Sequence, residues 1–167
     1  MIGSRRARLG VMLLAPLVAL LMWGGLRPEA TDPGALRLEV SLANRTLSVI
    51  ENGRVSKVYQ VAVGRPGNPT PTGSFRTGRI VWNPWWKPPA VWWARKKKAQ
   101  APGDPDNPMQ GVKIYFRAPD YYIHGTNDPA SIGRAASRGC VRMRESDAKS
   151  LARRIQKAGG SVPLRIA

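Results

Sequence analysis

The 167-residue sequence predicts a mainly-β domain with one C-terminal helix and a long loop rich in tryptophan and proline. Residues 36–42 alternate apolar and polar side chains, which is the two-residue period of a half-buried strand. Seventeen glycines and fifteen prolines favour turns and argue against a helical bundle. One convincing apolar stripe at helical spacing begins near Glu145, so a single helix is expected.

The first part of the domain is predicted to consist of strands joined by turns. Strands are expected at 36–42, 47–50, 55–63 and 74–80. The Asn52-Gly53 pair favours a hairpin turn, because both residues tolerate positive φ. In the third strand, alternation would place five side chains on the same side, namely Val55, Lys57, Tyr59, Val61 and Val63. Prolines are expected to fix a loop over 64–73.

Residues 82–111 predict the long loop, because prolines interrupt any regular ladder there. Its tryptophans are expected to anchor the loop on the domain, or alternatively to cap a site and stack on sugar rings. They are Trp82, Trp85, Trp86, Trp92 and Trp93. The run Arg95–Lys98 is expected to be solvated, or to meet anionic glycan or lipid with salt-sensitive strength.

The C-terminal part predicts strands at 112–117, 121–124 and 162–166 around the helix. The helix should bury a stripe that consists of Ala148, Leu151, Ala152, Ile155 and Ala158. Glu145 and Asp147 in its first turn suit the helix dipole, and Gly159-Gly160 should end it.

The N-terminal segment 1–30 predicts a secretory signal peptide or an uncleaved membrane anchor. The basic run SRRAR precedes the uncharged stretch 9–26. The remaining chain is therefore expected outside the cytoplasmic membrane, in the periplasm or an equivalent compartment, with membrane contact only through this segment. The net charge of +17 favours polyanionic partners, but export argues against nucleic acid as the partner.

Cys140 and His124 are the single cysteine and single histidine of the chain. A single cysteine cannot form an internal disulfide. One cysteine and one histidine are also too few ligands for a His/Cys metal centre, so no such centre is expected. An imidazole can take the proton of a thiol and so activate it for attack. Arg138 and Arg142 add positive potential that should lower the thiol pKa, while Asp128 or a backbone carbonyl near Gly125 could fix the histidine tautomer. The alternative is that both residues are simply structural.

The stretch HGTNDPASIGRAASRGCVRM, from His124 to Met143, resembles the signature of the L,D-transpeptidase catalytic domain, the YkuD family. The segments NPTPTGSF, PWWKPP and PGDPDNPMQG are similar to turns and loops of its ErfK/YbiS-like members. The resemblance covers residues 36–166 and implies an L,D-transpeptidase-like β-sandwich. It identifies the chain as a cell-wall enzyme without metal or organic cofactor.

By resemblance, Cys140 is the nucleophile and His124 the general acid/base. The thiolate attacks a peptidoglycan tetrapeptide stem, D-Ala leaves, and the acyl group passes to an amine on another stem or on a wall-anchored protein. Gly139 is expected to supply an oxyanion-hole N–H. Candidate substrate-binding residues are Arg138, Arg142, Ser137 and Tyr122. Arg138 stands where many members carry histidine; we expect it or Arg142 to pair with a stem carboxylate.

Three other readings remain open at this point. Transfer to water instead of an amine would make the protein an L,D-carboxypeptidase or cross-link hydrolase. A non-enzymatic wall-binding protein could keep the fold without the chemistry. Nucleic-acid binding is suggested by charge alone.

Overall fold

The computed structural model describes residues 36–167, which belong to one compact unit. The predicted signal or anchor segment 1–30 lies outside the described residues. Within residues 36–167, no helix is long and apolar enough to cross a membrane.

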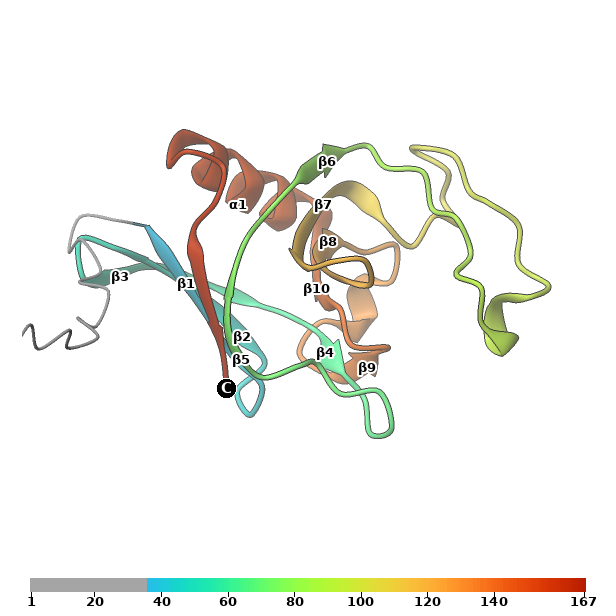
Figure 1. Ribbon diagram of the computed structural model, residues 1–167, viewed down its shortest axis with the longest axis horizontal. Helices are drawn as coiled ribbons and strands as arrows, with labels where there is room; N and C mark the ends of the chain where they lie inside the picture. The colour runs from blue at the N-terminus through green and yellow to red at the C-terminus, as the bar shows by residue number, and fades with distance from the viewer. Residues whose placement is uncertain (1–35) are drawn as a thin grey trace, which may run out of the picture. The chain divides into compact units, whose positions relative to one another are not determined.

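The first sheet has five strands in the order β3–β2–β1–β11–β5 (Figure 1). They are β1 (Arg37–Ser41), β2 (Thr46–Glu51), β3 (Arg54–Gln60), β5 (Gly73–Arg76) and β11 (Pro163–Ile166). β1 pairs in parallel with β11, and the other neighbours are antiparallel. The C-terminal strand therefore completes the sheet that the first hairpin begins.

The predicted turn between β2 and β3 is confirmed. Asn52 has a φ of 51° and Gly53 a φ of 73°, so both central residues adopt the positive φ that a two-residue hairpin requires. The predicted strand 55–63 is too long, since β3 ends at Gln60. Val55 is 59% exposed, because β3 is an edge strand and its register shifts opposite Val49 and Ile50.

Residues after Gln60 leave the first sheet. Val63 and Gly64 form β4 (Val63–Gly64), which pairs with β9 (Ala135–Ser137) in a small two-stranded sheet. The predicted strand 74–80 is likewise divided between β5 and β6 (Ile80–Trp82), which belong to different sheets. Between them Thr77 is buried and exchanges hydrogen bonds with Val162, at the point where the chain crosses over.

The second sheet has the order β10–β8–β7–β6. Its other strands are β7 (Gln110–Arg117), β8 (Tyr121–Gly125) and β10 (Val141–Met143). β10 runs parallel to β8, while β7 is antiparallel to both β8 and β6. The strands predicted at 112–117 and 121–124 are thus present, and the unpredicted β9 and β10 have only three residues each, too few for a period to show.

The helix α1 (Glu145–Lys157) buries Ala148, Leu151, Ala152 and Ile155, as predicted. Ala158, the last residue of the predicted stripe, is exposed at the C-cap. Gly159 and Gly160 have positive φ, and their N–H groups donate to the carbonyls of Gln156 and Ile155. This is the Schellman arrangement, in which glycine avoids the steric penalty of a left-handed conformation.

Both sheets and the helix share one hydrophobic core, which confirms the mainly-β sandwich with a single helix. The first sheet contributes Leu38 and Leu47, the second contributes Ile114 and Ile123, and α1 contributes Leu151. All five side chains are at most 1% exposed. Burial of this kind stabilises the fold by about 1.5–3 kcal/mol per large aliphatic side chain.

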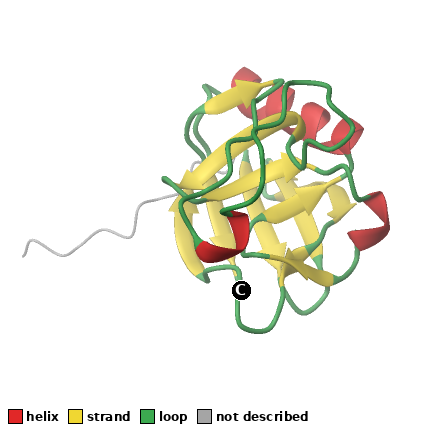
Figure 2. Ribbon diagram, turned by 90° about the vertical axis from the view of Figure 1, so that its right-hand side faces the viewer, coloured by secondary structure: helices red, strands yellow, loops and turns green. Residues whose placement is uncertain are grey.

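The long loop occupies residues 83–109, slightly less than predicted, since Trp82 belongs to β6 and Gln110 to β7. It contains the short 3-10 helix η1 (Trp92–Ala94) and a bridge between Trp86 and Gln100. Figure 2 shows the loop crossing in front of the strands.

Asn107 organises this loop from inside. Its side chain is 1% exposed and donates to the carbonyls of Pro84 and Ala101 at 3.0 and 2.9 Å, while its Oδ1 accepts from the Met109 N–H at 2.8 Å. These bonds join the two ends of an irregular segment. The loop therefore has a defined conformation without a regular ladder.

We expect Asn107→Ala to destabilise the protein by about 2–3 kcal/mol, because buried loop carbonyls and an N–H lose their partner. Chemical denaturation measures the loss, and limited proteolysis should show faster cleavage within the loop. Asn44→Ala is the matched control, since Asn44 is exposed and its backbone, not its side chain, bonds Ser41. Equal stability of the two variants would contradict this role for Asn107.

Candidate active site

Alternation along the second sheet separates an apolar face from a polar one. Val112, Ile114, Ile123, Val141 and Met143 are buried in the core. The intervening residues point to the other side. The register places His124 opposite Lys113 on β7 and opposite Arg142 on β10. A histidine thus lies between two cations on the face that is turned away from the core.

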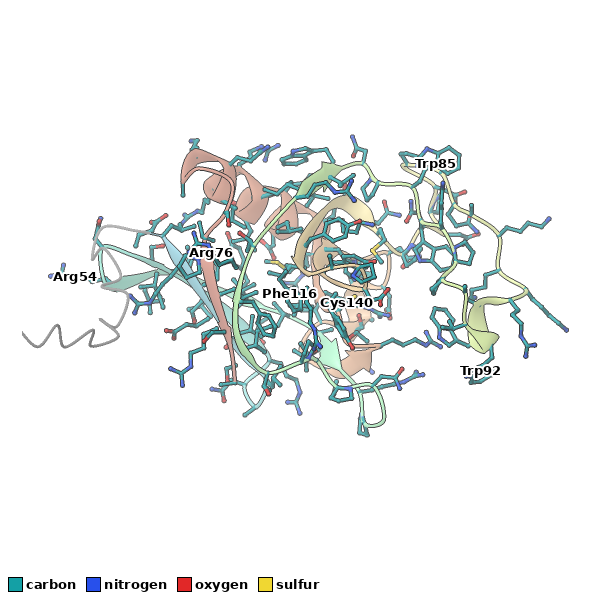
Figure 3. The ribbon with its side chains drawn as sticks, viewed as in Figure 1. Arg54, Arg76, Trp85, Trp92, Phe116 and Cys140 are labelled. Carbon is teal, nitrogen blue, oxygen red and sulfur yellow. The ribbon has the colours of Figure 1, made fainter. Side chains whose placement is uncertain are left out.

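Cys140 directly precedes β10 and reaches the same face. A cavity of about 1050 Å³ is bounded by this face and by the long loop. Its lining includes Cys140, His124, Tyr122, Arg138 and Arg142. In Figure 3, Cys140 lies between the core around Phe116 and the loop that bears Trp85 and Trp92. The fold therefore brings the single histidine and the single cysteine to one cavity.

The turn before Cys140 is fixed by Ser137. Its hydroxyl donates to the Cys140 carbonyl at 2.6 Å and accepts from the Gly139 N–H at 3.0 Å. Ser137 is 1% exposed and is not among the residues that line the cavity, so in this conformation it positions the turn. Its contact with substrate stays a prediction. The Gly139 N–H, the predicted oxyanion donor, is occupied by this bond to Ser137 in the present conformation. The Cys140 N–H, in contrast, has no hydrogen-bond partner within residues 36–167.

Gly139 is needed for two physical reasons. Its φ of 107° lies outside the region that side chains accept, and a Cβ there would come within 2.7 Å of the Tyr121 ring and 3.3 Å of the Pro69 carbonyl. The turn that precedes Cys140 is therefore packed tightly against Tyr121 and the proline-rich loop 64–73.

Gly139→Ala should destabilise the protein by about 3 kcal/mol and displace Cys140, because backbone strain and a steric clash act together. Gly133→Ala is the matched control: its φ is 84°, but a Cβ there meets nothing within 4 Å, so only about 1 kcal/mol of strain is expected. Denaturant unfolding and thiol reactivity compare the two. Similar losses in both variants would show that the contacts with Tyr121 and Pro69 are unimportant.

His124 is 3% exposed, and its Nδ1 lies 2.9 Å from the Gly125 carbonyl. A carbonyl only accepts, so we assign the proton to Nδ1 and the basic nitrogen to Nε2; the Pro108 carbonyl also interacts with the ring. Of the two predicted tautomer-fixing groups, the backbone carbonyl is the one found; Asp128 instead lies 3.9 Å from the Arg142 guanidinium. Burial, with smaller contributions from Arg142 and Lys113, lowers the pKa of His124 to about 4.

The Cys140 thiol is in contact with the Asp120 carbonyl at 3.5 Å. Burial raises its pKa to about 11, against the opposing effects of a Tyr122 backbone hydrogen bond, Arg142 and Lys113. The expected lowering by Arg142 is present, but desolvation exceeds it. Burial thus favours the neutral thiol and the neutral imidazole over an ion pair.

This protonation state can be tested by alkylation of the single cysteine. The rate of iodoacetamide modification should rise about tenfold per pH unit between pH 7 and 10, because only the thiolate reacts and its pKa is about 11. Intact-protein mass spectrometry measures the rate. A rate that is independent of pH between 6 and 9 would indicate a preformed thiolate instead.

Lys113 is the site residue that the sequence analysis missed. Its ammonium lies 4.5 Å from the centre of the Tyr122 ring and 4.9 Å from that of Tyr115, so two aromatic faces hold it at the cavity. The sequence does carry a signal for Lys113. Apolar and polar residues alternate over 112–117, so a strand with Val112 and Ile114 on its buried side places Lys113 on the opposite side.

The other predicted substrate contacts differ in their surroundings. Tyr122 lines the cavity and its hydroxyl donates to the Pro119 carbonyl. Arg138 is exposed, and its guanidinium stacks 4.0 Å from the centre of the Trp93 ring on the long loop. Trp85 and Trp86 also line the cavity, whereas Trp82 packs against the core. Trp85, Trp86 and Trp93 thus border the cavity, which is one of the two predicted roles, whereas Trp92 is 77% exposed.

Within residues 36–167, no cluster of three or more potential metal ligands is found.

Comparison with known proteins identifies the family. Residues 35–164 match the family described as YkuD, the L,D-transpeptidase catalytic domain. The protein named L,D-transpeptidase YkuD of Bacillus licheniformis is 37% identical over 128 residues, 77% of this chain and 64% of that relative. The protein named L,D-transpeptidase YbiS of Escherichia coli is 36% identical over 101 residues, 56% of this chain and 33% of that relative. This chain thus spans less than two thirds of either relative.

Solved structures agree with the fold. L,D-transpeptidase 3 from Mycobacterium tuberculosis, determined in complex with a faropenem-derived adduct, superposes with a TM-score of 0.59 at 15% identity, over 79% of this chain and 60% of that one. At this identity the likeness shows the fold alone. With the family match over most of its length, the chain belongs to the YkuD family of L,D-transpeptidase catalytic domains.

Proposed function

We propose that the protein is a peptidoglycan L,D-transpeptidase that uses Cys140 as nucleophile and His124 as general acid/base. The observation that carries the proposal is the convergence of the chain's single thiol and single imidazole on one cavity. Two purely structural residues would have no need to border the same cavity. Membership of the YkuD family supplies the reaction class.

Acylation begins with the neutral pair. His124 Nε2 accepts the thiol proton as Cys140 Sγ attacks the carbonyl of the third stem residue, a diamino acid. The new C–S bond forms, the C–N bond to D-Ala breaks, and the proton on Nε2 passes to the leaving amine. The Cys140 N–H, which is free of other described partners, is positioned to stabilise the oxyanion.

The thioester is then attacked by an amine of another stem or of a wall-anchored protein. His124 removes the amine proton and returns it to sulfur, so that the free thiol is regenerated and no external reductant or cofactor is consumed. Arg142 is proposed to pair with the terminal carboxylate of the stem, since it lines the cavity and its contact with Asp128 is a long one of 3.9 Å. A peptidoglycan substrate would require the catalytic domain to lie outside the cytoplasmic membrane, which agrees with the signal or anchor predicted for segment 1–30.

The test is incubation of the full chain, in nonionic detergent, with a disaccharide-tetrapeptide. Intact-protein mass spectrometry should detect the acyl-enzyme, and product analysis should detect a cross-linked dimer with release of D-Ala. A carbapenem should form a covalent adduct at Cys140. Tripeptide without dimer would assign the protein as an L,D-carboxypeptidase, and the absence of any acyl-enzyme or adduct would refute the proposal in favour of a binding protein.

A further inference from the structure

The cavity is strongly cationic. The charged residues that line it are Lys87, Lys96, Lys97, Lys98, Lys113, Arg138, Arg142, Asp106 and Asp120. Cations outnumber carboxylates by seven to two, and His124 adds no charge because burial lowers its pKa to about 4. Lys113 and Arg142 flank the reacting pair on the sheet, whereas Lys96, Lys97 and Lys98 stand on the opposite wall, which the loop provides.

These charges are poorly neutralised by the protein itself. Within residues 36–167, Arg142 is the one lining cation within 4.0 Å of a carboxylate. Lys113 and Arg138 are held by aromatic rings instead. Arg138 is exposed but loses part of its hydration, and this desolvation, followed by the repulsion of Arg65 and Arg142, lowers its pKa. Like charges brought together in this way repel one another, and an anionic ligand relieves that repulsion.

The arrangement favours a ligand with carboxylates at two places. One group of cations lies beside Cys140 and His124, where the terminal carboxylate of a stem would bind. Lys96, Lys97 and Lys98 of the loop form a separate group of charges, which a single carboxylate bound beside Cys140 would not neutralise. Electrostatic complementarity across two walls selects between ligands of similar shape that differ in charge.

We propose that the enzyme selects a donor stem whose diamino acid carries a free side-chain carboxylate, over the same stem in which that group is a carboxamide. This inference rests on the proposed function and specifies its substrate class. Lys96, Lys97 and Lys98 read the additional carboxylate, so they act on donor binding and not on the chemical step at Cys140.

The experiment compares the free-acid and amidated stems as donors for the full chain in nonionic detergent, with release of D-Ala as the readout. The free acid should have a kcat/KM about tenfold higher, mainly through KM, since each exposed ion pair contributes a fraction of that factor. Raising the ionic strength from about 0.05 to 0.5 M should reduce the preference, because screening shortens the reach of exposed charges.

A charge-matched pair of variants assigns the selection. The triple substitution Lys96→Gln, Lys97→Gln, Lys98→Gln should bring the free-acid to amide ratio close to one. Arg54→Gln, Lys57→Gln, Arg165→Gln removes the same charge from exposed positions that do not line the cavity, and it should keep the ratio; Figure 3 shows Arg54 on the far side of the core from Cys140.

The outcomes separate the two claims. Equal turnover of both stems by the unmodified chain would overturn the charge selection and leave the transpeptidase intact. A preference lost equally in both triple variants would also overturn it, because net charge and not the loop would be responsible. No release of D-Ala from either stem would refute the proposed function, and the charge selection with it.

Discussion

Replacement of Cys140 by alanine is expected to lower the rate of D-Ala release by about 10⁴-fold or more, the scale seen when an enzyme loses its covalent nucleophile. The side chain supplies the atom to which the acyl group is attached, and the sequence contains no second thiol. The measurement is steady-state release of D-Ala, together with intact mass for the acyl-enzyme, which should be absent.

Cys140→Ser is the companion variant, since it keeps the size of the side chain and its contact with the Asp120 carbonyl. A hydroxyl is far less acidic than a thiol, so this variant should be nearly as inactive. Both variants should unfold within about 1–2 kcal/mol of the unmodified chain, because only one small group is removed or exchanged at the wall of a cavity. Residual activity above a hundredth of the original in Cys140→Ala would place the nucleophile elsewhere.

Periodicity predicted the fold where elements are long enough to show a period. The helix at Glu145–Lys157 and the hairpin around Asn52-Gly53 depend on local signals, namely an apolar stripe and a pair of residues that tolerate positive φ. β10 has three residues and depends on pairing with β8, a contact distant in sequence. The same holds for the end of β3 at Gln60, because the chain then leaves the first sheet and pairs as β4 with β9, a contact distant in sequence.

The sequence was enough to predict which residues form the site, but not the burial and electrostatic surroundings of those residues. His124 and Cys140 were identified from their residue types and from a resemblance, and the fold brings both to one cavity. Their protonation was not predictable, since positive neighbours in the sequence suggest a lowered thiol pKa while desolvation raises the pKa to about 11. Burial is a property of the folded chain. The roles of Ser137 and Lys113 also required the register and the turn geometry.

His124→Asn should lower the rate of acylation by about 10²- to 10⁴-fold, the usual contribution of a general acid/base. Asparagine can still donate to the Gly125 carbonyl, as Nδ1 does at 2.9 Å, but it has no basic nitrogen at the position of Nε2. The variant therefore separates the structural from the chemical role of the ring. D-Ala release measures the rate, and a loss smaller than about fivefold would assign His124 a structural role only.

The same substitution should alter how stability depends on pH. In the unfolded chain His124 titrates near 6.5, and in the folded protein burial lowers its pKa to about 4. The unfolded state therefore binds the extra proton between these values, so stability is complete above pH 6.5 and declines by about 3 kcal/mol as the pH falls to 4. Since this is the single histidine, the slope between pH 6.5 and 5, where few carboxylates titrate, belongs to it alone. Denaturant unfolding should show that slope in the unmodified chain and a nearly flat line in His124→Asn. Parallel curves would mean that the imidazole is hydrated in the folded protein, and a hydrated imidazole would leave the thiol free to form the ion pair that burial otherwise prevents.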